Sequence, residues 1–201
     1  MHSNNLLLYK LHLVRFWMLL GCLFFLFGQF SRAEEGPWRW SNPRPHGNPI
    51  RAMAKGEDFS IQVGDNGSIH TSQNLVQWFP RNTGVENTFR AVDFFDGQAI
   101  VAGDGGVLFY SESEESFVSA ELNQSTSRSF FALAASSRTI VAAGEGGSLY
   151  TSVDGRAWRK RSFRYSNNIN SIVWTGRYFV MAGENGFVAT SRDGSSWTKR
   201  Q

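Results

Sequence analysis

The stretch from Ala143 to Trp158, "AGEGGSLYTSVDGRAW", decides the fold because three near-copies of it occur in the same chain. The copies read "VGDNGSIHTSQNLVQW", "AGDGGVLFYSESEESF" and "AGENGFVATSRDGSSW". We call the second residue of each copy the reference glycine, and these glycines are spaced by 39, 41 and 39 residues. Self-similarity at a fixed period near 40 residues indicates a repeat architecture. The four reference glycines are Gly64, Gly103, Gly144 and Gly183.

Three further columns keep the same distance from the reference glycine in every repeat. An aromatic residue follows it by fourteen positions, a small residue precedes it by twelve, and a large apolar residue lies two positions further back. Chance does not produce such agreement across four units. In repeat order, the aromatic residues are Trp78, Phe117, Trp158 and Trp197, the small ones Ala52, Ala91, Ala132 and Ser171, and the large apolar ones Ile50, Phe89, Phe130 and Ile169.

Each repeat is expected to contain four short strands. The first is centred on the small residue, and the aromatic residue opens the fourth. A two-residue turn, Asn-Gly or Gly-Gly after an acidic residue, joins the second and third strands, because these pairs supply the positive φ angles of a tight hairpin. No helical period occurs outside the N-terminal segment, so the sequence predicts an all-β protein. The second strands carry the apolar residues Ile61, Ile100, Val141 and Val180, and the third strands are expected to place Ile69, Leu108, Leu149 and Val188 inward.

Four-stranded repeats of this length are typical of the blades of a β-propeller, here with about four blades. The first strands crowd around the central axis, which explains their small residues. The glycine-rich turns could also suggest a phosphate-binding loop, but such loops lead into a helix, and here they join two strands with no Lys-Ser or Lys-Thr after them.

The way the ring closes stays open at this stage. Trp38 or Trp40, in "PWRWSNPRPHGNP", looks like the fourth-strand aromatic of a preceding unit, and the sequence ends in a short strand, "WTKRQ". A leading strand could therefore complete the last blade of a small closed ring. Alternatively, the blades form an open arc whose apolar end faces would favour self-association.

The first 33 residues have the pattern of a secretory signal peptide. Basic residues precede an apolar run over 16–27 that is too short for a usual membrane span, and Ser31-Arg32-Ala33 suits signal peptidase. We therefore expect a leader over 1–33, a leading segment over 34–49, a propeller over 50–201, and export to the periplasm or the extracellular space. Lipidation of Cys22, within a weak lipobox, or a retained leader would instead anchor the chain to a membrane.

The charge balance and the cysteine content limit the classes of partner. The net charge of +3 equals the three cationic residues of the leader, so the rest of the chain is balanced and predicts neither nucleic-acid binding nor an anionic membrane as partner. Cys22 is the single cysteine, so a chain cleaved after Ala33 would fold without disulfides.

The last two repeats contain a recognisable turn motif, with "SVDGRAW" around Asp154 and Gly155 and "SRDGSSW" around Asp193 and Gly194. It resembles the Asp-box, or BNR, repeat of the sialidase superfamily of propellers, and is most similar to the branch of photosystem II assembly and stability factors and related exported proteins. The resemblance runs from about Trp38 to the end. These boxes have one residue fewer before Trp158 and Trp197 than the usual pattern, and the first two repeats carry Asn74 and Ser113 at the Asp position, with Phe117 in place of Trp in the second.

The resemblance implies a structural role for the box and no clear catalytic site. In this family the boxes lie on the face opposite the active site. Sialidases use an arginine triad, a Tyr–Glu pair and an Asp, and this sequence does not display that set. Its Pro49-Ile50-Arg51 differs from the Arg-Ile-Pro motif of those enzymes. The acidic turn residues could supply a carboxylate pair or bind a cation, but acids are ordinary at turns. His46 and His70 are too few for a zinc site. We expect no catalysis, cofactor or metal. The acidic turn residues are Asp65, Asp104, Glu145 and Glu184.

Binding to a protein partner is the favoured function, with a carbohydrate-binding or glycosidase-related propeller as the alternative. The loops between repeats vary, and variable loops on a rigid scaffold are where recognition occurs. The stretch that most strongly suggests a binding surface is "RAWRKRSFRYSNN". In a strand, its Lys160 would point to the side opposite its two arginine neighbours. Such charges either protect an exposed edge strand or dock an acidic partner or glycan. The candidate binding residues are Arg159, Arg161, Arg164, Tyr165, Arg128 and Arg81.

Overall fold

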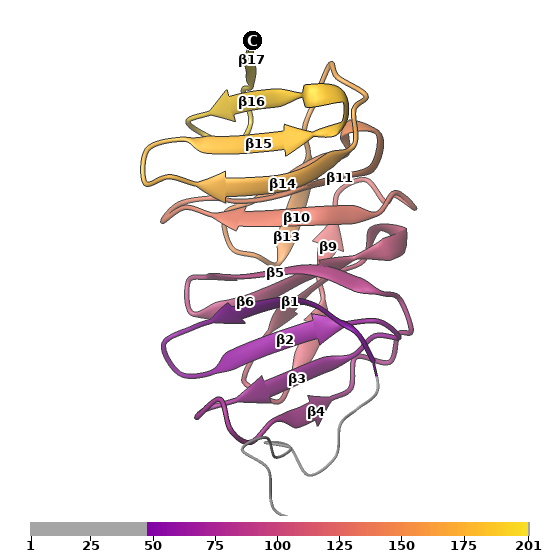
Figure 1. The fold of residues 1–201 in the computed structure, drawn as a ribbon, viewed down its shortest axis with the longest axis vertical. Helices are drawn as coiled ribbons and strands as arrows, with labels where there is room; N and C mark the ends of the chain where they lie inside the picture. The colour runs from indigo at the N-terminus through magenta and orange to yellow at the C-terminus, as the bar shows by residue number, and fades with distance from the viewer. Residues whose placement is uncertain (1–47, 201) are drawn as a thin grey trace, which may run out of the picture. The chain divides into compact units, whose positions relative to one another are not determined.

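The structure is a computed structural model that describes residues 48–200. The expected leader over 1–33, Cys22, and the strand expected around Trp38 or Trp40 lie outside the described residues. Residues 48–200 contain strands and short 3-10 turns, and this part of the chain forms four sheets that follow one another in sequence order (Figure 1). The prediction of an all-β propeller with four blades is confirmed.

Each blade is an antiparallel meander of four strands, as expected from the repeat. Blade 1 contains β1 (Ile50–Lys55), β2 (Ser60–Gly64), β3 (Ile69–Ser72) and β4 (Phe79–Arg81). Blade 2 contains β5 (Phe89–Phe95), β6 (Gln98–Gly103), β7 (Leu108–Ser111) and β8 (Phe117–Ser119). Blade 3 contains β10 (Phe130–Ala135), β11 (Ile140–Gly144), β12 (Leu149–Ser152) and β13 (Ala157–Lys160). Blade 4 contains β14 (Ile169–Trp174), β15 (Phe179–Gly183), β16 (Val188–Ser191) and β17 (Thr198–Arg200).

Blade 3 has a fifth strand that the repeat did not predict. The segment β9 (Glu121–Leu122), part of the linker that leaves blade 2, pairs in parallel with β13. Asn123 extends the pairing, because its side-chain oxygen accepts a hydrogen bond of 2.8 Å from the Lys160 N–H. The interpretation of Arg159 and Lys160 as protection for an exposed edge is therefore wrong for β13, whose edge is covered by β9.

Neighbouring blades pack through their first strands and through apolar side chains on both faces. Strand β5 lies between β1 and β10, and β14 lies on the far side of β10. Three clusters of buried apolar side chains lie between the blades. They include Phe89, Phe130 and Ile169, the large apolar residues of the first strands of blades 2 to 4, which are each fully buried. Ala91 and Ala132 are also buried, as the crowded axis requires. Because each face is covered by a neighbour, such a stack is stabilised by interfaces between repeats.

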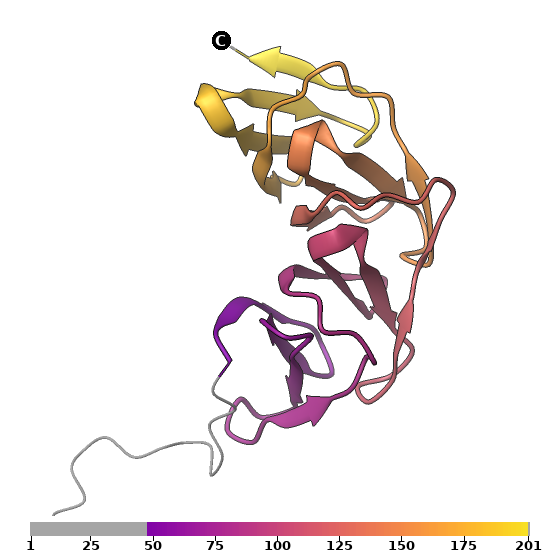
Figure 2. The same ribbon diagram turned by 90° about the vertical axis from the view of Figure 1, so that its right-hand side faces the viewer.

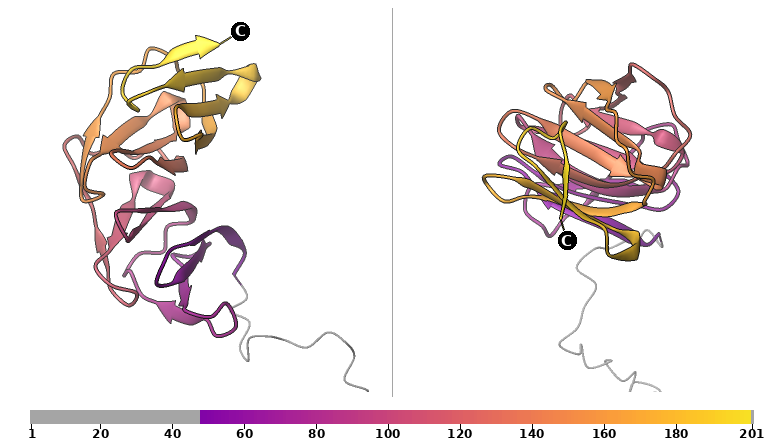
Figure 3. Two further views of the ribbon diagram at one scale, coloured as in Figure 1. Left: turned by 90° about the vertical axis from the view of Figure 1, so that its left-hand side faces the viewer. Right: turned by 90° about the horizontal axis from the view of Figure 1, so that it is seen from above.

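The described blades form an open arc, with blade 1 at one end and blade 4 at the other (Figures 2 and 3). Burial follows the same order. Ile50, at the column position of the fully buried Phe89, is 52% exposed in blade 1. Val188 in blade 4 is 37% exposed, whereas Ile69, at the same position in blade 1, is fully buried. The expectation that Val188 points into a covered interface is therefore wrong for the described residues, since no further blade covers it there.

The glycine turns join the second and third strands, which confirms the hairpin interpretation. Asn66 and Gly67 both have positive φ, as the Asn-Gly pair predicts. The loop is one residue longer than expected and includes the acidic residue, because the Gly64 N–H donates to the Ser68 carbonyl and the Ser68 N–H donates to the Asp65 carbonyl. Equivalent hydrogen bonds close the turn of blade 3.

The reference glycine has a second function, a close approach between backbones. At the start of each first strand a β-bulge shifts the register, and a carbonyl there lies against the glycine. A Cβ on Gly144 would lie 2.1 Å from the Ser129 carbonyl oxygen, so only glycine fits. The same carbonyl accepts a hydrogen bond of 2.9 Å from the Glu145 N–H, which ties the turn to the first strand.

Candidate binding site

The box turns join the third and fourth strands, at the end of each blade opposite the glycine turn. In blade 3 the Ser152 hydroxyl accepts hydrogen bonds from the N–H groups of Asp154 and Gly155. The Asp154 carboxylate accepts from the N–H groups of Arg156 and Ala157, both at 2.9 Å. Short polar side chains often satisfy the backbone of turns in this way. The box residues of blade 3 thus hold the turn, as the structural interpretation predicts, and Asp193 does the same in blade 4.

The pKa values of the box carboxyl groups reflect this bonding. Burial raises the pKa of Asp154, but hydrogen bonds from the Ala157 and Arg156 N–H groups and from the Ser152 hydroxyl outweigh burial, so the pKa lies below its ordinary value. The pKa of Asp193 is lowered for the same set of reasons. Both groups are therefore ionised acceptors of the fold at neutral pH.

In blades 3 and 4 the box glycine and tryptophan connect the blade to the preceding one. A Cβ on Gly155 would lie 2.6 Å from a methyl carbon of Ile100 in blade 2, and a Cβ on Gly194 would lie 2.6 Å from Val141 in blade 3. Trp158 is buried in the core between blades 2 and 3, and its indole N–H donates to the Gly155 carbonyl at 2.9 Å. In blade 1 Leu75 occupies the glycine position with φ of 62° and is half exposed.

The two altered boxes retain part of the bonding. In blade 1 the Asn74 side-chain oxygen accepts from the N–H groups of Val76 and Gln77 at 2.9 Å, as Asp154 does in blade 3. In blade 2 the Ser113 hydroxyl accepts weaker bonds of 3.2 Å from Glu115 and Ser116. The turn geometry is therefore preserved where the Asp is lost.

Beside the box turns of three blades lie pockets lined by an arginine that is hydrogen-bonded to a threonine of the neighbouring strand. The arginine Nε donates to the threonine hydroxyl at 2.7 Å in blade 3 and at 2.8 Å in blades 1 and 4. The pockets have volumes of about 220 Å³ in blade 1, 330 Å³ in blade 3 and 370 Å³ in blade 4. Sequence reasoning missed this pairing, although its residues recur at fixed positions. The pairs are Arg81 with Thr71, Arg161 with Thr151, and Arg200 with Thr190.

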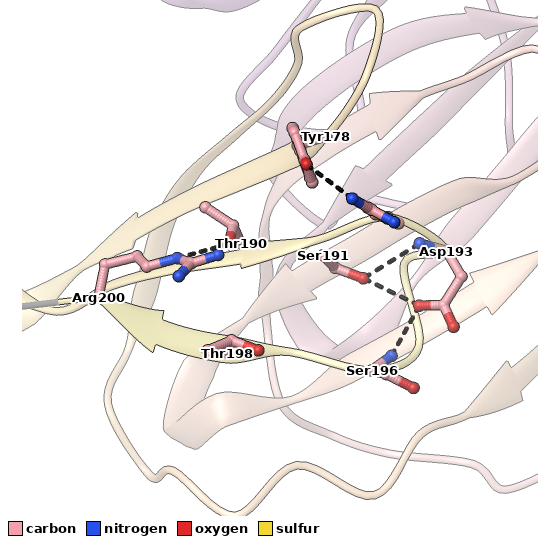
Figure 4. A pocket seen from close by; sticks show the side chains of 8 residues that line it. Tyr178, Thr190, Ser191, Asp193, Ser196, Thr198 and Arg200 are labelled. Carbon is pink, nitrogen blue, oxygen red and sulfur yellow. Dashed lines mark hydrogen bonds between the residues drawn. The ribbon is translucent and has the colours of Figure 1, made fainter.

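The pocket of blade 4 is open to solvent and carries a net positive charge, because two arginines, Arg192 and Arg200, line it against one carboxylate, Asp193 (Figure 4). Arg192 donates to the Tyr178 hydroxyl at 3.0 Å and lines the same pocket as Arg200 and Thr190. The hydrogen bond from Arg192 lowers the pKa of Tyr178 below its ordinary value, and the charges of Arg177, Arg192 and Arg200 lower it further. Because three arginines lower the pKa of this tyrosine hydroxyl, the local electrostatic potential is positive.

The candidate binding residues fall into two groups at opposite ends of the blades. Arg159 and Arg161 line the pocket of blade 3, on one side of the strand as alternation predicts. Arg164 and Tyr165 lie at the glycine-turn end, where the guanidinium donates to the tyrosine hydroxyl at 2.7 Å and lies over its ring. A single docking patch that contains all of them is therefore not formed.

The remaining two candidates are engaged by the fold. Arg128 donates to the Gly146 carbonyl at 2.8 Å, at the glycine turn of blade 3. Arg81 forms an ion pair with Glu114 of blade 2 at 3.3 Å, and both side chains are largely buried. Arg81 therefore ties blade 1 to blade 2, and Arg128 ties the segment before β10 to the glycine turn of its own blade.

The acidic turn residues are also engaged within the fold. Asp65 accepts two hydrogen bonds from Arg51, at 2.8 and 2.9 Å, and Asp104 pairs with Arg90 in the same way. The hydrogen bonds from these arginines hold the pKa of both carboxyl groups below the ordinary value. Glu145 accepts from the Ser129 N–H at 3.0 Å. Within residues 48–200 no group of three or more His, Cys, Asp or Glu side chains is placed to hold a metal ion.

Comparisons with known proteins support the fold alone. No protein-family profile matches the sequence, and no curated protein is detectably similar. Among solved structures, the chain resembles the computationally designed Ika4 protein, with a TM-score of 0.62 and 16% identity over 78% of this chain and 99% of that one. It also resembles the designed Ika8 protein, with a TM-score of 0.61 and 16% identity over 76% of this chain and 48% of that one.

A third match is a structure of YCF48 bound to a D1 peptide, with a TM-score of 0.48 and 14% identity over 75% of this chain and 66% of that one. The chain spans about half the length of Ika8 and about two thirds of YCF48. Together with the four blades stacked through their first strands, the likeness to the designed proteins defines the chain as a β-propeller. Within residues 48–200 no helix is long and apolar enough to cross a membrane.

Proposed function

We propose that the chain is a non-catalytic, exported β-propeller that binds an acidic protein partner and serves as an assembly scaffold. The observation that carries the proposal is the pair of cationic pockets on blades 3 and 4. Arg159 and Arg161 line one, and Arg192 and Arg200 line the other. No acidic side chain forms an ion pair with these four arginines within residues 48–200. Charged side chains aligned in this way on a rigid scaffold favour complementary acidic surfaces.

The non-catalytic part of the proposal rests on how the acidic side chains are used. A glycosidase needs two carboxyl groups that face one substrate. In this propeller Asp65 and Asp104 are paired with arginines, while Asp154 and Asp193 accept backbone N–H groups of their own turns. Each of these carboxylates therefore already has a role in folding. The proposal of export rests on the composition of residues 1–33.

The test compares partner capture by charge variants of the full-length chain. The variant Arg159→Glu with Arg161→Glu reverses the charge in the blade 3 pocket. The control, Lys160→Glu with Lys199→Glu, makes the same change of net charge, at Lys160 between those two arginines and at Lys199 on β17. We expect a purified acidic partner to bind the wild type and the control, and to bind the pocket variant at least about tenfold more weakly.

Two further measurements separate this proposal from its rival. Hydrolysis of fluorogenic glycosides would contradict the non-catalytic part. Binding to a glycan array that is lost in the Arg159 and Arg161 variant, without any protein partner, would favour a carbohydrate-binding propeller instead. N-terminal sequencing of exported protein should find a chain that begins after Ala33, and retention of the leader in an exported chain would refute cleavage.

A further inference from the structure

Blade 1 contains a carboxylate that shows what its arginine–threonine pair can bind. Glu114, from the box turn of blade 2, accepts hydrogen bonds from the Thr71 hydroxyl at 3.1 Å, the Gln73 amide at 2.6 Å and the Arg81 guanidinium at 3.3 Å. One glutamate oxygen faces Thr71 and Arg81, and the other faces Gln73. We call these three residues the carboxylate cradle of blade 1.

Blade 4 has a cradle at the same positions, with an arginine in place of the glutamine. Thr71, Gln73 and Arg81 stand seven, nine and seventeen positions after Gly64, and the residues at those distances from Gly183 are Thr190, Arg192 and Arg200. The arginine–threonine hydrogen bond is present in both blades, at 2.8 Å. The replacement of the amide by Arg192 adds a second cation, which strengthens binding to a carboxylate.

The cradle of blade 4 differs from that of blade 1 in being open. Thr71 is fully buried beneath blade 2, whereas Thr190 is only half-buried and Arg200 is exposed. In the part of the chain that the structure describes, neither Arg192 nor Arg200 forms an ion pair with an acidic side chain. Blade 3 lacks the full set, because Val153 stands at the position of Gln73.

From this equivalence we infer that the cradle of Thr190, Arg192 and Arg200 binds the carboxylate of a glutamate presented by a turn of a partner protein. The inference rests on the proposed function and names the site and the chemistry of the ligand. The carboxylate lies between the two guanidinium groups, with the Thr190 hydroxyl as a third donor, in the arrangement that Glu114 has in blade 1.

An apolar neighbour favours a protein turn over an acidic sugar. Val188 pairs directly with Arg200 across the two strands and is 37% exposed. Its counterpart Ile69 pairs with Arg81 and is covered by blade 2. In blade 1, therefore, the neighbouring blade supplies both the glutamate that binds the cradle and the apolar side chains that cover Ile69. A partner segment that combines the two would bury Val188 while its carboxylate binds the cradle.

The test uses a probe taken from the protein itself, a backbone-cyclised peptide with the sequence of residues 109–119, "FYSESEESFVS". Calorimetry with the full-length chain should show saturable one-to-one binding. We expect Glu114→Gln in the peptide, and Arg192→Gln or Arg200→Gln in the protein, each to weaken binding by about tenfold or more. Lys199→Gln, one position before Arg200 on β17, removes the same charge and should leave binding within about twofold.

A second readout reports occupancy without relying on affinity. A bound carboxylate competes for Arg192 and neutralises its charge, so the pKa of Tyr178, followed by NMR of carbon-13-labelled tyrosine, should rise when the peptide binds. Thermal melting of each variant shows whether it is folded. Equal binding of the Glu114→Gln peptide, equal weakening by Lys199→Gln, or no binding at all overturns the site. Displacement of the peptide by an acidic oligosaccharide at equal concentration overturns the assignment to a protein ligand.

The outcome separates this site from the proposed function. If the variant Arg192→Gln with Arg200→Gln captures the acidic partner as well as the wild type does, the cradle is not its site and the scaffold function stands. If neither pocket affects capture, both proposals fail.

Discussion

The glycine turns offer a matched pair of substitutions that isolates one packing contact. Gly147 in blade 3 and Gly186 in blade 4 occupy the same position of the repeat, with φ of 73° and 68°. A Cβ on Gly147 would lie 2.0 Å from the carbonyl oxygen of Tyr165, in the linker to blade 4, whereas a Cβ on Gly186 would meet no atom within 4 Å. The two alanine variants therefore share the backbone strain and differ in the steric clash alone.

The magnitudes follow from these two terms. An alanine in the left-handed region costs about 1–2 kcal/mol of folding free energy, and this is the whole effect expected for Gly186→Ala. Gly147→Ala must also displace a backbone carbonyl by about 1 Å, which adds about 1–3 kcal/mol as overpacking does in a core. For a domain of this size, 1 kcal/mol lowers Tm by about 2–4 °C.

Thermal unfolding by circular dichroism measures the difference. We expect Gly186→Ala to lower Tm by about 2–8 °C and Gly147→Ala by about 4–20 °C, with the larger loss always in blade 3. Equal losses of Tm, or a larger loss for Gly186→Ala, would refute the claim that the linker's backbone packs against the glycine turn of blade 3.

Three further outcomes are expected from the turn and cradle contacts. Asp154→Ala should lower the free energy of unfolding in urea by about 1–3 kcal/mol, because two N–H groups lose their acceptor. Asp154→Asn should lower it by under about 1 kcal/mol, because Asn74 makes the same hydrogen bonds in blade 1. Equal losses for the two variants would contradict this role of Asp154. The stabilising contribution of Asp104 and Asp154 should be complete above pH of about 4 and fall as the pH drops further, because their folded-state pKa values are lowered. A chain equally stable at pH 3 and pH 7 would refute these shifts. Glu114→Ala should destabilise the chain by about 1.5–3 kcal/mol through the loss of its charged bonds to Arg81, and an unchanged urea midpoint would show that the cradle of blade 1 contributes nothing.

The predictable parts of the fold are those that depend on residue types recurring at fixed positions in all four repeats. The reference glycine serves a close backbone approach that every blade makes, and the recurring columns identified strands, turns and blade number. Burial of the small residue did not follow from its column, because Ala91 and Ala132 are buried in blades 2 and 3 whereas Ser171 in blade 4 is exposed. The first-strand arginines Arg51 and Arg90 escaped notice because they occur in two repeats only. Their ion pairs with Asp65 and Asp104 depend on which turn lies beside which strand, and spacing does not contain that information.

The strand β9 and the cradle were missed for different physical reasons. Glu121 and Leu122 have no periodic signal, and their pairing arises because the linker runs along β13. The threonine and the arginine recur in three repeats, but blade 2 has Tyr110 and Ala120 at these two positions, and the ligand Glu114 comes from a neighbouring repeat. A search within one repeat finds neither a partner from the next repeat nor a pairing between a linker and a strand.

The position of β9 has a consequence for how the molecule opens. Its backbone belongs to the linker from blade 2 while its hydrogen bonds belong to the sheet of blade 3, so these two blades cannot separate without breaking both the core between them and the ladder at the outer edge. Local opening should therefore begin at the two ends of the arc. In hydrogen-exchange experiments, the amides of β11 and β12 would form the slowest-exchanging unit, and those of β1 and β17 would exchange first.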